Sequence, residues 1–113
     1  MKLRGTDIDF RYTRAADAER LTKATDRLRE RSEEMEKAAE AGWGPNVKTT
    51  INVFREYIHT ATGKDLLEGC DDLGVAEEAY YDFMDEVDRQ KKEFQEQHIK
   101  RASKYIKLKE KVK

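Results

Sequence analysis

Residues 47–61 read V-K-T-T-I-N-V-F-R-E-Y-I-H-T-A and form the most apolar stretch with helical spacing in the chain. At about 100° per residue, their apolar side chains gather on one stripe of a helix. The stripe comprises Val47, Thr50, Ile51, Phe54, Ile58 and Ala61, with Val53 and Tyr57 beside it. The sequence therefore predicts that this helix is the centre of the core. The sequence also predicts a break before this helix at residues 42–46, G-W-G-P-N, and an end of the helix at Gly63.

Helical periodicity also extends over the stretches on both sides. Residues 15–41 predict one helix whose large apolar side chains, Leu21, Leu28 and Met35, recur every seven residues. A long helix is predicted from Val75 to at least Ala102, with its packed face strongest over residues 76–87. Lys91 and His98 interrupt the apolar stripe of this helix. We therefore expect residues 104–113 to form a basic projecting tail.

The N-terminal residues show a different period. In residues 6–13, T-D-I-D-F-R-Y-T, the apolar side chains Ile8, Phe10 and Tyr12 alternate with charged ones, which is typical of a half-buried strand. No second strand is evident in the sequence. Since an unpaired strand edge can accept another strand, Ile8, Phe10 and Tyr12 are predicted to contact a partner or a second copy of the chain.

The overall composition favours helices. Of the 113 residues, 42% are charged and 37% hydrophobic, with one Pro and six Gly, which favours a mainly α-helical fold with a short N-terminal strand over a sandwich or barrel. We expect residues 1–113 to form one helical domain. No apolar run is long enough for a membrane span or a signal peptide, and the single cysteine, Cys70, fits a reducing cytoplasm.

Residue types that carry out catalysis or bind metals are scarce. The chain has two histidines and one cysteine, without a Gly-rich phosphate loop, a Ser-centred elbow or a metal-binding spacing. The acidic residues between Asp65 and Asp88 lack the pattern of a calcium-binding loop. We therefore expect no enzyme activity, no cofactor and no metal.

Charge is distributed unevenly along the chain. Ten acidic residues and no Lys or Arg lie between Asp65 and Asp88, whereas residues 98–113 contain seven Lys or Arg and one acid. The acidic part suits a basic partner segment, and the basic tail could contact phosphates of a nucleic acid. Tyr81, Ile99 and Ile106 project from the same side of the predicted long helix. They form a second strip, predicted either to contact a partner or to lie under the N-terminal strand.

Several segments resemble a family of small phage and prophage proteins from Gram-positive bacteria, the tail assembly chaperones of long-tailed phages. The resemblance lies in residues 6–21, T-D-I-D-F-R-Y-T-R-A-A-D-A-E-R-L; residues 54–69, F-R-E-Y-I-H-T-A-T-G-K-D-L-L-E-G; residues 72–87, D-L-G-V-A-E-E-A-Y-Y-D-F-M-D-E-V; residues 90–94, Q-K-K-E-F; and the K-Y of residues 104–105. The chain differs at its end, where residues 105–108 read Y-I-K-L and relatives often have a Pro-Asn and Arg-rich ending.

The resemblance implies a non-enzymatic chaperone in the host bacterial cytoplasm. Such a protein coats the aggregation-prone tape measure protein and recruits tail tube protein during tail assembly. Self-association is expected separately from the residues, because the lone strand at residues 8–12 and the thin seam of Leu21, Leu28 and Met35 leave apolar and backbone groups without partners. Two alternatives remain open from the sequence: a small nucleic-acid-associated phage regulator that uses the basic tail, and a minor structural protein of the virion.

Overall fold

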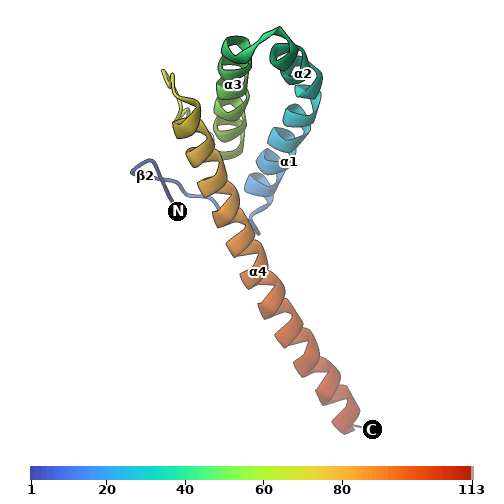
Figure 1. Cartoon of the computed structure of the whole chain (residues 1–113). Coiled ribbons are helices and arrows are strands. Elements are labelled where there is room, and N and C mark those ends of the chain that lie inside the picture. Colours follow the sequence, from blue (N-terminus) through green and yellow to red (C-terminus); the bar gives the residue numbers. More distant parts are fainter. Residues whose placement is uncertain (113) are drawn as a thin grey trace.

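The chain is mainly α-helical, as predicted, with a two-stranded N-terminal hairpin and a long C-terminal helix (Figure 1). This computed structural model describes the backbone of residues 1–112 and the side chains of residues 1–106. Its elements are β1 (Lys2–Leu3), β2 (Thr6–Asp7), α1 (Ala15–Glu30), α2 (Ser32–Ala41), α3 (Trp43–Thr62) and α4 (Leu73–Val112). No helix within the described residues is long and apolar enough to cross a membrane.

Helix α3 is the central element, which confirms the prediction made from residues 47–61. It contacts α1, α2 and α4, and six of its side chains are buried. The helix ends at Gly63, whose left-handed backbone (φ 76°) lets its N–H reach the carbonyl of His59. The predicted break before α3 is too wide, because only Gly42 (φ 132°) interrupts the helices. Pro45 fits inside the first turn of α3, where a backbone N–H has no intrahelical acceptor.

The prediction of one continuous helix over residues 15–41 is wrong. Arg31 separates α1 from α2, and its N–H is shared between the carbonyls of Arg27 (3.1 Å) and Leu28 (3.2 Å). Its guanidinium bridges Glu34 of α2 and Glu56 of α3, both at 2.8 Å. This bend lets α2 continue along α3, as Figure 1 shows, whereas a straight helix would leave it.

The predicted N-terminal strand is corrected in both its length and its pairing. Only Thr6–Asp7 is strand, and it pairs antiparallel with Lys2–Leu3 of the same chain. The intervening residues, Arg4 (φ 51°) and Gly5 (φ 76°), are both left-handed, as the commonest two-residue hairpin turns require. Two further bonds between Met1 and Ile8 extend the pairing, at 2.7 and 3.0 Å. The chain itself therefore supplies the second strand that the sequence did not reveal.

Helix α4 has two parts with different surroundings. Over residues 73–90 it packs on the body, where Ala76, Ala79, Phe83 and Val87 are buried. From Lys91 to Ile106 every side chain is exposed, and this part of the helix runs clear of the other elements (Figure 1). We call residues 91–106 the arm. The predicted basic tail, residues 104–113, continues the arm, but the side chains of residues 107–113 lie outside the described part of the chain.

Candidate functional site

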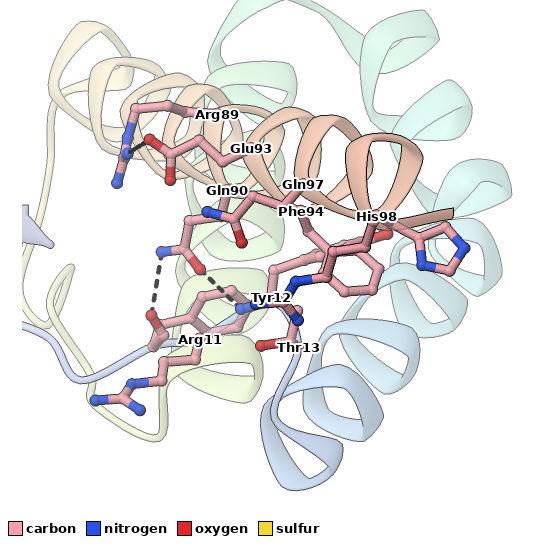
Figure 2. A pocket seen from close by; sticks show the side chains of 11 residues that line it. Arg11, Tyr12, Thr13, Arg89, Gln90, Glu93, Phe94, Gln97 and His98 are labelled. Atoms are coloured by element: carbon pink, nitrogen blue, oxygen red, sulfur yellow. Dashed lines mark hydrogen bonds and ion pairs between the residues drawn. The ribbon is translucent and has the colours of Figure 1, made fainter. Parts of the chain in front are cut away.

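A groove lies where the arm leaves the body (Figure 2). One wall is the extended segment of residues 10–13, and the other is the face of α4 between residues 89 and 101. Its volume is about 440 Å³. The lining residues are Phe10, Arg11, Tyr12, Thr13, Arg89, Gln90, Glu93, Phe94, Gln97, His98 and Arg101. The groove thus lies between two segments that are about 80 residues apart in the sequence.

Gln90 fastens the N-terminal segment to α4. Its side-chain oxygen accepts the backbone N–H of Tyr12 at 2.7 Å, and its nitrogen donates to the carbonyl of Phe10 at 3.1 Å (Figure 2). A primary amide offers one acceptor and two donors, so this side chain satisfies both backbone groups as a neighbouring strand would. Gln90 therefore sets the position of the groove wall relative to the helix.

Replacing Gln90 by alanine should lower the free energy of unfolding by about 1–3 kcal/mol, because two partly buried hydrogen bonds are lost at about 0.5–1.5 kcal/mol each. Gln90→Glu should have an intermediate effect, since a carboxylate accepts from Tyr12 but cannot donate to Phe10. Urea unfolding followed by circular dichroism measures both. Gln97→Ala, at an exposed position two turns along α4, is the matched control, and an equal loss there would refute the role of Gln90.

A buried carboxylate of α1 binds the same segment. Asp17, in the first turn of α1, accepts the backbone N–H of Arg11 at 2.9 Å and lies 3.3 Å from the guanidinium of Arg14. Arg14 also donates two hydrogen bonds to Asp9, and this bonding lowers the pKa of Asp9. Residues 9–14 are thus bound to α1 through Asp17 and to α4 through Gln90. These contacts fix the position of this groove wall.

The charges along the α4 wall are partly paired. Arg89 donates to Glu86 and, at 2.7 Å, to Glu93. The hydrogen bonds from Arg89 lower the pKa of Glu86 below its ordinary value. No described side chain forms an ion pair with Arg11 or Arg101, which lie on opposite walls. These two cations are positioned to meet acidic groups of a bound partner.

Aromatic side chains supply the apolar part of the groove. Phe94 is 46% exposed, and its ring stacks on His98 one turn later, with the ring centres 6.0 Å apart. Both follow the direction of Phe83 and Val87 around α4, so they continue the core-facing stripe beyond the point where the body ends. Tyr12 lies half-buried on the facing wall. This arrangement suits an apolar side chain from a partner, such as one on an amphipathic helix.

The five predicted partner-binding residues separate into three environments. Ile8 and Phe10 are core residues, 3% and 4% exposed, so the prediction that their side chains are open to a partner is wrong. The backbone of Ile8 pairs with Met1, and the ring of Phe10 meets Phe83 of α4. Tyr12 lines the groove. Tyr81 (56% exposed) and Ile99 (62% exposed) lie on the surface of α4, and the alternative that the N-terminal strand buries Tyr81 is also wrong.

Among the described residues, no three His, Cys, Asp or Glu side chains come together as a group that could hold a metal ion. The two histidines lie apart, on α3 and on the arm. What sequence reasoning missed is Gln90 with the groove it creates. The only local indication was a polar residue on the apolar stripe, one turn before Phe94.

The chain was compared with protein-family models, with curated proteins and with solved structures. No family model matches it, and no curated protein or solved structure does.

Proposed function

We propose that this protein is a non-enzymatic phage tail assembly chaperone that binds the tape measure protein and the tail tube protein in the host bacterial cytoplasm. The observation that carries the proposal is the arm: sixteen residues of helix on which every side chain is exposed, including Phe94, Ile99, Tyr105 and Ile106. Large apolar side chains that a body leaves uncovered mark surfaces for other proteins. The resemblance in residues 6–21, 54–69 and 72–87 supplies the identity of the partner.

The groove and the arm fit the task of holding an amphipathic segment. A tape measure helix lying along the arm would place its apolar side chains on Phe94, His98 and Tyr105, which share one side of α4. Its acidic side chains would meet Arg11 and Arg101 at the groove. Contacts of this kind need neither nucleotide nor a reacting group, and release requires only that the assembling tube compete for the same surface.

Co-expression with the cognate tape measure protein tests the proposal. We expect soluble tape measure protein and a recoverable complex. Phe94→Ala should weaken binding by about 30-fold or more, the effect of losing a central aromatic anchor worth about 2 kcal/mol. Trp43→Ala is the matched control, because Trp43 is equally aromatic and even more exposed (71%) but lies at the start of α3, away from the groove.

Three results would contradict the proposal. If the tape measure protein stayed insoluble and no complex formed, the chaperone role would be refuted. Salt-sensitive binding of duplex DNA by this chain, in place of tape measure binding, would favour the regulator. Retention of the protein in finished phage particles would favour a structural role in the virion.

A further inference from the structure

Helix α4 carries opposite charges on its two halves. Residues 73–88 contain six acidic side chains and no Lys or Arg: Glu77, Glu78, Asp82, Asp85, Glu86 and Asp88. Residues 89–106 contain six basic side chains, Arg89, Lys91, Lys92, Lys100, Arg101 and Lys104, against two acids, Glu93 and Glu96. The net charge is therefore −6 over residues 73–88 and +4 over residues 89–106. The charge changes sign near Gln90, where the arm begins.

We propose that two copies of this chain pair through α4 in antiparallel orientation. This arrangement places the acidic half of each helix beside the basic arm of the other copy. A parallel pair would instead bring the two acidic halves together and the two basic arms together, and like charges held in contact are unfavourable. The proposal concerns the surface of α4 alone and does not depend on the tape measure protein.

One strip along α4 has the spacing that such a pair needs. Positions 81, 85, 88, 92, 95 and 99 alternate steps of four and three residues, which keeps them on one side of a helix that pairs with another. All six side chains are exposed. Tyr81 and Ile99 are the large apolar members, 18 residues and about 27 Å apart at 1.5 Å per residue. We call these six positions the strip.

The strip is complementary to itself in one antiparallel register. When Tyr81 faces Ile99 of the second copy, Asp85 faces Gln95 and Asp88 faces Lys92, and the two-fold symmetry repeats each contact. Within one chain Lys92 already lies 3.0 Å from Asp88, so both charges are on the same side of the helix. The dimer thus has an apolar contact at each end of the strip and two ion pairs at its centre.

This pairing does not require any other part of the molecule to move. Tyr80 and Met84, which lie on another side of α4, contact Phe54 and Tyr57 of α3, so the body does not cover the strip. Phe94 lies about 140° around the helix from Ile99, at 100° per residue. The groove therefore stays open in the dimer, and one copy can bind a partner while it is paired.

Disulfide cross-linking tests the orientation. In a Cys70→Ser background, one protein carries Asp85→Cys and a second carries Gln95→Cys, both at exposed positions. The two cysteines lie about 15 Å apart along the helix. We expect a covalent dimer when the two proteins are mixed and oxidised, and almost none from either alone. Gln97→Cys mixed with Asp85→Cys is the control, since Gln97 lies on the far side of the arm, and it should not cross-link.

Reversal of the central charges tests the register. Asp88→Lys and Lys92→Asp should each weaken dimerisation at least tenfold, because each places like charges opposite one another twice. The double variant Asp88→Lys/Lys92→Asp should return the dissociation constant to within about threefold of the original. Sedimentation equilibrium measures all four proteins. A monomer up to about 1 mM chain, self-cross-linking of each single cysteine variant, or failure of the double variant to restore the dimer would each overturn the proposal.

Discussion

Replacing Phe83 by alanine is expected to lower the free energy of unfolding by about 3–5 kcal/mol, the usual cost of removing a fully buried phenylalanine ring. Phe83 is 0% exposed and lies in the middle of the packed part of α4. Its ring meets Phe10 edge-on at 5.3 Å and Tyr57 of α3 at 6.2 Å between ring centres. The ring therefore joins α4, α3 and the N-terminal segment, and its loss leaves a cavity between three elements.

A domain of this size is stable by roughly 5–15 kcal/mol, so the Phe83→Ala substitution should remove about a fifth or more of the free energy of unfolding. Urea unfolding monitored by circular dichroism measures the change. Phe94→Ala is the matched control: the same residue type lies on the same side of the same helix three turns later, but it is half-exposed on the arm. We expect Phe94→Ala to lower the free energy of unfolding by less than about 1 kcal/mol. Equal losses in the two variants would show that the arm is packed.

The sequence predicts the helices well where they are long and amphipathic. The apolar stripe of residues 47–61 identifies α3 as the core helix, and Gly63 marks its end, because periodicity and the left-handed glycine are local properties. The weakening of the α4 stripe after Val87 likewise indicates where the body ends. The bend at Arg31 is not predictable in this way, since it depends on Glu56 of α3 as well as on residues of α1 and α2.

The N-terminal residues show where local patterns become insufficient. The alternation of Ile8, Phe10 and Tyr12 correctly separates the sides of the segment, since the first two are buried and the third is half-buried. It does not reveal what covers them. Strands of two residues are too short to show a period, and the cover comes from Phe83 and Gln90, more than 70 residues away.

The long separation in sequence between the N-terminal segment and Gln90 also explains why no sequence pattern indicates the groove. Gln90 appears in the sequence as a polar interruption of the α4 stripe, whereas in the structure its amide bonds the backbone of Phe10 and Tyr12. Every residue other than proline has the same backbone N–H and C=O groups, so a side chain that binds them can have partners of almost any residue type. No pairing of particular residue types in the sequence therefore indicates this contact. Helical spacing places Tyr81 and Ile99 away from the core stripe, but it leaves open whether the N-terminal segment covers them; only the structure shows that both are exposed.

If the proposed function holds, removing the arm is expected to abolish the proposed tape measure binding while leaving the body folded. A chain ending at Lys92 keeps Gln90 and every buried side chain of α4 among residues 73–106, because no side chain from Lys91 to Ile106 is buried. Its melting temperature should fall by no more than about 8 °C, the shift that 1 kcal/mol produces in a domain of about this size. A chain ending at Ser103 lacks only the basic tail and should melt within the same range.

The two truncations separate three explanations of binding when they are compared by thermal melting and pull-down. Loss of the complex in the chain ending at Lys92 and its retention in the chain ending at Ser103 would assign binding to residues 93–103, which include Phe94 and Ile99. Loss in both would assign it to residues 104–113, and a steep dependence on salt would then indicate contacts made by the lysines. Retention in both would place the site on the body and refute the arm as the binding surface. A large fall in melting temperature for the shorter chain would mean that the arm stabilises the fold, which the exposure of its side chains argues against.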